Sequence, residues 1–99
     1  MRKYELMTII KPNLDAEEVE KVIDKISATV TELGGSIDNV DKTGRKKLAY
    51  DIQNFRDGFF TTMTLELPAD KVAEFKRQLR LNDSLLRTMF MEVAQKASV

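Results

Sequence analysis

The chain has 99 residues, of which 42% are hydrophobic and 32% charged, and its 16 basic and 16 acidic residues give a net charge of zero. These values are typical of a single soluble globular domain and argue against a disordered chain. The sequence has no cysteine and no histidine, which excludes disulfides, thiolate zinc sites and catalysis by either side chain.

The first part of the chain predicts a strand followed by a helix. Residues 2–11 combine alternation with an apolar run, which is typical of a strand. A helix is then expected to begin at Asp15, because Asp15 and Glu18 have the spacing of a capping box. Apolar residues recur at helical spacing behind this start and form one stripe. The glycine pair at residues 34–35 is predicted to end the helix.

A long strand and a second strand are predicted next. Residues 36–52 indicate a strand that is interrupted or bulged near Gly44. Residues 54–58, NFRDG, are predicted to form a turn. Residues 59–67 are rich in aromatic and β-branched side chains, which favours a strand.

The last part of the chain repeats the helix and strand pattern. A helix is expected from Pro68 until Asn82 and Asp83, because proline suits a first helical turn and apolar residues follow at helical spacing. Residues 84–93 predict the final strand, and residues 94–99 a short flexible C-terminal tail.

This order predicts an α+β fold. Two strand–helix–strand units with right-handed crossovers interleave into one four-stranded antiparallel sheet, with both helices on one face. The expected spatial order of the strands is four, one, three, two. The pattern contains no linker, repeat or membrane-spanning run, so we expect a single domain over residues 1–93 and a cytoplasmic protein.

The face of the sheet opposite the helices, called the open face below, is predicted to be unusually apolar. Alternation leaves apolar side chains there on the first and third strands, and the fourth strand can add two methionines. Scattered exposed apolar atoms are normal, but a methionine-rich patch also suits the docking of a protein. The predicted residues of this protein interface are Met7, Ile9, Phe60, Met89 and Met91.

Basic residues gather in a single stretch of this neutral chain. Residues 1–41 hold nine acidic and five basic residues, whereas residues 42–50 hold four basic residues and no acidic residue. Strand polarity places the end of the second strand beside the starts of the third and fourth strands and the end of the second helix. We therefore expect a cationic cluster that could neutralise phosphates, with a tyrosine to stack on a base, formed from Lys11, Lys46, Lys47, Tyr50, Arg80 and Arg87.

Other interpretations stay open at this point. Cations near strand ends can be solvent-exposed residues without a binding role, or can prevent aggregation at a sheet edge. An exposed apolar sheet can also self-associate, so a homodimeric ligand-binding or interaction module is the alternative function. A phosphate-processing enzyme could combine Asn13 or Asn39 with Arg2 or Lys11, but the sequence has no glycine-rich phosphate loop. We therefore expect no catalytic site, no metal or other cofactor and no small-molecule substrate.

Three segments carry a resemblance to a known family. MRKYE, GRKKLAYDI and LRLNDSLLRTMFM make the chain similar, over residues 1–93, to the sixth protein of the bacterial small ribosomal subunit. The family pattern is matched at Met1, Arg2, Tyr4 and Glu5, at Gly44 and residues 46–50, and at Arg87. Phe90 stands where the family usually has methionine at or beside that place, and Asp51 where it often has proline.

The resemblance implies a ferredoxin-like fold and a structural RNA-binding role. Family members bind the central domain of 16S ribosomal RNA together with the eighteenth small-subunit protein, which implies a location on the ribosome in the cytoplasm. The open face then resembles the surface for the protein partner. The RNA-binding residues implied by the motifs and by their predicted neighbours are Arg2, Arg45, Lys46, Lys47, Tyr50, Arg80 and Arg87.

Overall fold

The computed structural model describes residues 2–93. Its elements are β1 (Arg2–Ile10), α1 (Ala16–Glu32), β2 (Ser36–Ile52), β3 (Phe55–Leu67), the short 3-10 helix η1 (Ala69–Lys71), α2 (Val72–Arg80) and β4 (Leu85–Glu92). The predicted order of strands and helices is confirmed. The tail predicted for residues 94–99 lies outside the described residues.

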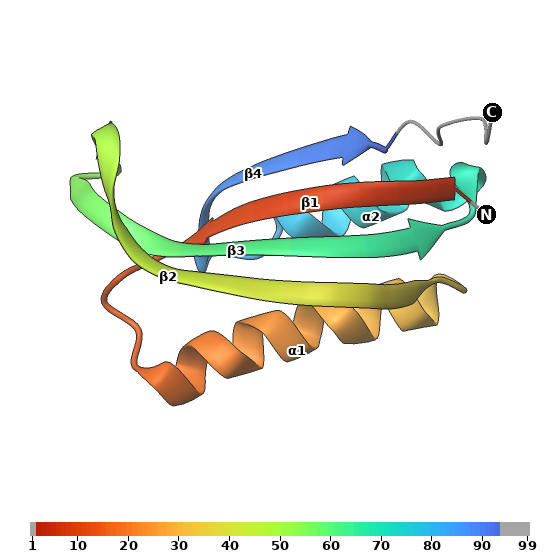
Figure 1. The fold of residues 1–99 in the computed structure, drawn as a ribbon, viewed down its shortest axis with the longest axis horizontal. Coiled ribbons are helices and arrows are strands. Elements are labelled where there is room, and N and C mark those ends of the chain that lie inside the picture. The colour runs from red at the N-terminus through yellow and green to blue at the C-terminus, as the bar shows by residue number, and fades with distance from the viewer. Residues whose placement is uncertain (1, 94–99) are drawn as a thin grey trace, which may run out of the picture.

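The four strands form one antiparallel sheet in the order β2-β3-β1-β4, which confirms the predicted spatial order. Side chains of α1 and α2 join those of β1 and β3 in a single buried cluster. Both helices therefore cover the same face, and the opposite face carries neither of them (Figure 1).

The first helix begins and ends where the sequence predicted. The Glu18 backbone N–H donates to Asp15 Oδ1 at 2.8 Å, and the Asp15 N–H donates to Glu18 Oε1 at 3.4 Å, which completes the capping box. At the other end the Gly35 N–H donates to the Val30 carbonyl at 2.9 Å. Gly34 has a φ of 86°, a conformation that glycine adopts without the steric penalty of a Cβ.

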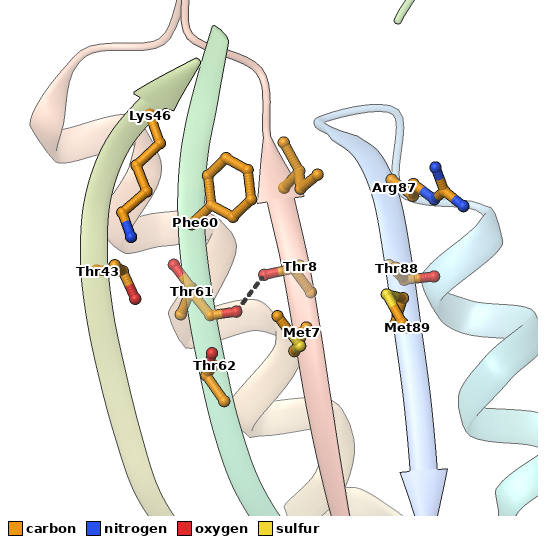
Figure 2. A pocket seen from close by; sticks show the side chains of 11 residues that line it. Met7, Thr8, Thr43, Lys46, Phe60, Thr61, Thr62, Arg87, Thr88 and Met89 are labelled. Carbon is orange, nitrogen blue, oxygen red and sulfur yellow. Dashed lines mark hydrogen bonds between the residues drawn. The ribbon is translucent and has the colours of Figure 1, made fainter. Parts of the chain in front are cut away.

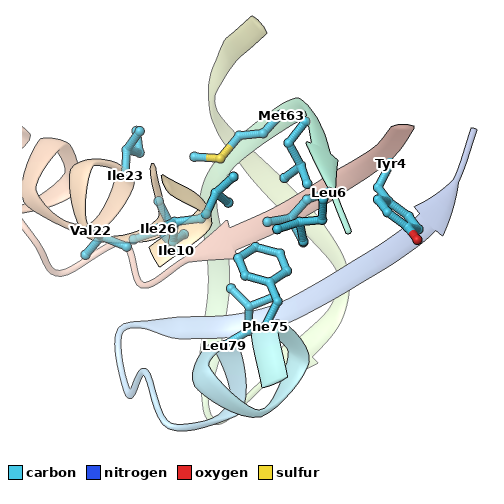
Figure 3. Packing of buried hydrophobic residues seen from close by; sticks show 12 residues of the cluster. Tyr4, Leu6, Ile10, Val22, Ile23, Ile26, Met63, Phe75 and Leu79 are labelled. Atoms are coloured by element: carbon cyan, nitrogen blue, oxygen red, sulfur yellow. The ribbon is translucent and has the colours of Figure 1, made fainter. Parts of the chain in front are cut away.

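Alternation along β1 and β3 builds the core (Figure 3). Leu6 and Ile10 of β1 and Met63 and Leu65 of β3 are fully buried, and Phe75 of α2 lies fully buried with them. Each of these strand residues is two or four positions from the next on its own strand, as expected where one face of a sheet is buried. The residues between them face the other way, which creates the open face.

The departure from the family pattern at residue 90 belongs to the core. Phe90 of β4 stacks on Tyr4 of β1 with ring centroids 4.8 Å apart, and its centroid is 5.5 Å from that of Phe75. Aromatic pairs at such separations stabilise a core beyond their buried area. Phe90 therefore packs on the helix side of the sheet and contributes nothing to the open face.

The predicted turn at residues 54–58 is wrong over most of its length. Only Gln53 and Asn54 connect the two strands, because Ile52 already pairs with Phe55. The φ angles of the two connecting residues are 50° and 68°, as in a type I′ hairpin turn. The hairpin of β2 and β3 is therefore longer than expected and extends beyond the end of β1.

Gly58 explains why the sequence misled this prediction. Asp57 and Gly58 resemble a turn signal, but Gly58 pairs with Lys46 inside the hairpin. A Cβ at Gly58 would lie 2.5 Å from Ile9 Cγ2 and 3.2 Å from the Ile10 carbonyl oxygen. Glycine is thus required here by the close approach of β1, not by a turn.

We predict that Gly58→Ala destabilises the domain by about 1–3 kcal/mol, the usual cost of overpacking. Urea denaturation monitored by circular dichroism measures this loss. Ile9→Ala in the same chain removes the clashing methyl group, so it should cost less in the Gly58→Ala background than in the parent. Equal costs in the two backgrounds would contradict the assigned contact.

Candidate nucleic-acid and protein interface

The open face carries the five apolar residues that the sequence placed there. Ile9 pairs with Phe60, and Met7 with Met89, across neighbouring strands. Met91 lies two positions beyond Met89 on the same face, and the two residues are 46% and 47% exposed, respectively. The strand register of β4 therefore places both methionines in the exposed apolar patch, which the sequence had left undecided.

The tip of the β2–β3 hairpin bends over one end of the open face. β2 and β4 are opposite edges of the sheet, and in a flat sheet three spacings of about 4.8 Å would separate them. Arg87 of β4 nevertheless donates a hydrogen bond to the Tyr50 hydroxyl of β2, and its Cζ is 5.9 Å from the centre of the Tyr50 ring. The hairpin leaves the plane of the sheet at this end in Figure 1.

An irregular stretch of β2 permits this bend. Lys47 pairs with Asp57 and Ile52 with Phe55, so five steps along β2 are matched by two along β3. The extra residues of β2 interrupt the regular ladder and bend the strand. Tyr50 lies within this stretch and is 58% exposed.

Under the bent hairpin the open face forms a hollow of about 170 Å³ (Figure 2). Its apolar lining comes from the patch on β1, β3 and β4. Lys46 of β2 and Arg87 of β4 line it from opposite edges of the sheet, so two of the predicted cations border the same hollow. The hollow therefore combines an apolar floor with positive charge at its rim.

The other residues of the basic stretch lie on the opposite side of the hairpin. Arg45, Lys46 and Lys47 pair with three successive residues of β3, so their side chains alternate between the two sides. Arg45 lies over the ring of Phe59 at 5.7 Å, and Phe59 packs against the core. Arg45 and Lys47 therefore face the helix side, and only Lys46 of these three faces the hollow.

Arg80 and Arg2 also lie apart from the hollow. Arg80 at the end of α2 lines a groove with Thr88 and Phe90 on the helix side of β4. Arg2 begins β1, whereas Ile9 near the other end of that strand pairs with Arg87. Seven residues of extended strand span roughly 23 Å. The predicted RNA-binding residues therefore do not form one continuous cluster. They occupy four places: the rim of the hollow, the helix side of the hairpin, the groove beside β4 and the start of β1.

Ion pairs divide these cations further. Arg2 Nη1 is 3.1 Å from Glu92 Oε1, and Arg45 Nε is 2.8 Å from Asp57 Oδ2. Exposed pairs of this kind contribute about 0–1 kcal/mol, but their carboxylates would repel an approaching phosphate. Within residues 2–93, no acidic side chain forms an ion pair with the remaining cationic candidates, which are Lys46, Lys47, Arg80 and Arg87.

One strongly shifted carboxyl group lies on α2. Hydrogen bonds from Arg77 and Gln78 lower the pKa of Glu74 to about 2, and Arg77 contributes the larger part. Glu74 in turn raises the pKa of Arg77. Because the two charges are satisfied within the helix, Arg77 is a poor candidate for phosphate contact, in contrast to Arg80 one turn later.

The structure also adds residues that the sequence did not single out. Thr43, Thr62 and Thr88 line the hollow between the apolar and basic side chains. Alternation along β3 could have identified Thr62, whereas Thr43 lies at a register shift of β2, where alternation fails.

In the described residues no group of acidic side chains is arranged to hold a metal ion. No helix among residues 2–93 is long and apolar enough to cross a membrane.

Comparisons with known proteins identify the family of this chain. A sequence model described as "Ribosomal protein S6" matches residues 3–92. The small ribosomal subunit protein bS6 of Halalkalibacterium halodurans is 37% identical over 89 residues, which cover 90% of this chain and 94% of that protein. The bS6 protein of Dictyoglomus turgidum is 38% identical over 89 residues, covering 90% and 92% of the two chains.

A solved structure has the same fold. The crystal structure of 30S ribosomal protein S6 from Thermotoga maritima superimposes with a TM-score of 0.88 at 29% sequence identity. The match covers 93% of this chain and 87% of that one. The ferredoxin-like fold implied by the sequence motifs is therefore confirmed.

We predict that Tyr50→Phe loosens Arg87 without destabilising the domain. The change removes the hydroxyl that accepts the Arg87 hydrogen bond, and at this exposed position the free energy of unfolding should change by less than about 0.5 kcal/mol. Nuclear magnetic relaxation of the arginine side-chain nitrogens should show a lower order parameter for Arg87 and an unchanged one for Arg80. An unchanged order parameter for Arg87 would show that Tyr50 does not hold it.

Proposed function

The chain belongs to the ribosomal protein S6 family of the small ribosomal subunit, and from that premise we propose that it binds the central domain of 16S ribosomal RNA together with the eighteenth small-subunit protein. It is a structural component of the ribosome and not an enzyme. Membership of this family favours the ribosomal role over the homodimeric module that the sequence had left open.

The observation that carries the proposal is the convergence of Lys46, Tyr50 and Arg87 beside an exposed apolar patch. Two cations that form no ion pair within residues 2–93 lie at the rim of the hollow. An exposed aromatic ring lies against one of them. Cations neutralise backbone phosphates and release counterions, while an aromatic ring stacks on an unpaired base. This combination suits RNA better than a small-molecule substrate.

The remaining cations supply secondary RNA contacts in this proposal. Lys47 and Arg45 face the other side of the same hairpin, so an RNA strand that passes the hairpin tip can be contacted on both sides. Arg80 has no described ion pair and borders β4. Arg2 lies at the far end of β1 and is paired with Glu92, so its contact requires a separate segment of RNA.

The open face is the proposed surface for the protein partner. Its apolar patch is composed of Met7, Ile9, Phe60, Met89 and Met91, and neither helix covers it. Contiguous exposed apolar surface is typical of protein interaction sites, and methionine side chains adapt to the shape of a partner. The patch extends to the hollow at the hairpin, so the proposed RNA and protein surfaces are neighbours.

We predict that Lys46→Ala combined with Lys47→Ala weakens binding to a central-domain RNA fragment without unfolding the protein. The logarithm of the binding constant falls linearly with the logarithm of the salt concentration. Each lost duplex-phosphate contact should reduce the magnitude of this negative slope by roughly 0.9. Filter binding over a salt series, with the protein partner present, measures it. The matched control is Lys21→Ala with Lys25→Ala, which removes two exposed lysines of α1. A slope equal to that of the control would remove both lysines from the RNA contacts.

We predict that Phe60→Asp abolishes detectable binding of the eighteenth small-subunit protein, because the change puts a charge at the centre of the apolar patch. Calorimetric titration with the purified partner measures the loss, and cooperative thermal melting shows that the domain is folded. Leu81→Asp is the control, since it introduces the same charge at a leucine that is 63% exposed outside the open face. Normal partner binding by the folded Phe60→Asp protein would refute the open-face proposal.

A further inference from the structure

The open face carries opposite charges at its two ends. At the end where β1 begins, Glu66 of β3 lies opposite Lys3 in the strand register. Glu5 lies two residues further along β1 on the same face. Asp41 pairs with Thr62 of this face, and Asp38 lies 3.6 Å from the Lys3 ammonium group. Three carboxylates and one ammonium group lie at this end, and Asp41 adds a fourth carboxylate level with Met7, so this half of the face has an excess of negative charge.

The hairpin end of the same face is positive. Lys46 and Arg87 line the hollow there, and no acidic side chain is among its lining residues in the described structure. Lys3 and Ile9, which mark the two ends on β1, are six residues apart, which is about 20 Å of strand. The apolar patch overlaps the acidic half of the face, because Glu5 lies opposite Met91 and Asp41 lies level with Met7 through Thr62. The charge of the face thus changes from negative to positive along the direction of the strands.

This charge order argues against nucleic acid as the occupant of the whole face. A phosphate backbone that crossed the acidic end would meet several carboxylates, and the repulsion would oppose the contacts made at the basic end. Sheets that bind single-stranded RNA across their faces use two or three aromatic side chains as stacking platforms. Among the open-face residues of β1, β3 and β4, only Phe60 is aromatic. On the open face, RNA is therefore restricted to the hairpin end.

A protein segment can contact both the carboxylates and the apolar patch of the face. Within residues 2–93, Glu5, Asp41 and Glu66 form no ion pair, so they are available to lysine or arginine side chains of a partner. The apolar patch takes apolar side chains, and Lys46 and Arg87 repel cationic side chains of the partner. Reversing the segment would place its cationic side chains against Lys46 and Arg87 and leave the three carboxylates without partners.

We propose that the open face receives its protein partner in one fixed orientation: cationic side chains of the partner lie against Glu5, Asp41 and Glu66, an apolar side chain lies over Phe60, and Lys46 and Arg87 are left to RNA phosphates. The proposal rests on the assignment of the open face to the partner protein and adds the chemistry that the partner must present. The acidic end acts as the specificity determinant, because the apolar patch alone has no direction.

The test uses the intact protein and the purified eighteenth small-subunit protein of the same organism. The triple variant Glu5→Gln, Asp41→Asn, Glu66→Gln keeps the shape of each side chain and removes three negative charges. At low salt its affinity for the partner should fall roughly ten-fold, and the difference should shrink at high salt because exposed charges are screened. The control Glu17→Gln, Asp24→Asn, Glu32→Gln removes the same charges from exposed positions of α1 and should stay within about two-fold of the parent.

The Phe60→Asp protein separates this proposal from the one on which it rests. If Phe60→Asp abolishes partner binding while the triple variant binds like its control, the open face is the interface but the charge-guided orientation is wrong. If Phe60→Asp binds normally, the assignment of the face itself is wrong.

If the triple variant instead gains affinity for the RNA fragment in the absence of the partner, nucleic acid covers the acidic end. If sedimentation shows that the parent protein dimerises and the triple variant does not, while partner binding is unchanged, a second copy is the occupant. Either of these last two results would also overturn the orientation proposal.

Discussion

The burial of alternate side chains along β1 and β3 is the constraint on which the rest of this structure depends. Leu6 and Ile10 on one strand, and Met63 and Leu65 on the other, are fully buried under the two helices. Because successive strand residues point to opposite faces, the side chains that alternate with these buried residues must point to the open face. The core therefore determines which side chains are exposed there, and both helices pack on the other face and leave them uncovered (Figure 1).

The bend of the β2–β3 hairpin is the second feature that determines the candidate site, because it decides which side chains border the hollow. It joins β2 and β4, the two edges of the sheet, through Tyr50 and Arg87, and it encloses a hollow at one end of an otherwise open surface. Lys46 and Arg87 consequently border both the proposed RNA surface and the proposed protein surface. The two surfaces are not independent patches, because they meet at these side chains.

Local sequence patterns predicted the elements well where one short-range interaction decides the outcome. The capping box at Asp15 and the glycine that ends α1 involve residues only a few positions apart, so the pattern and the structure agree. Gly58 shows the opposite case. Its neighbour in the chain suggests a turn, but the atom that requires glycine belongs to Ile9, far away in sequence. A short pattern cannot contain that information.

The same distinction between short-range and long-range interactions applies to the candidate site. By itself the sequence determined the order of the elements, the two helix stripes and the sets of residues that share each face of β1 and β3, because these follow from periodicity within a single element. Only the tertiary structure decided the register of β4, the separation of Lys46 from Arg45 and Lys47, the isolation of Arg2 and Arg80, and the contact between Tyr50 and Arg87. Each of these depends on the pairing or bending of strands that are distant in the chain, and such contacts are set by packing between elements and not by the pattern within one.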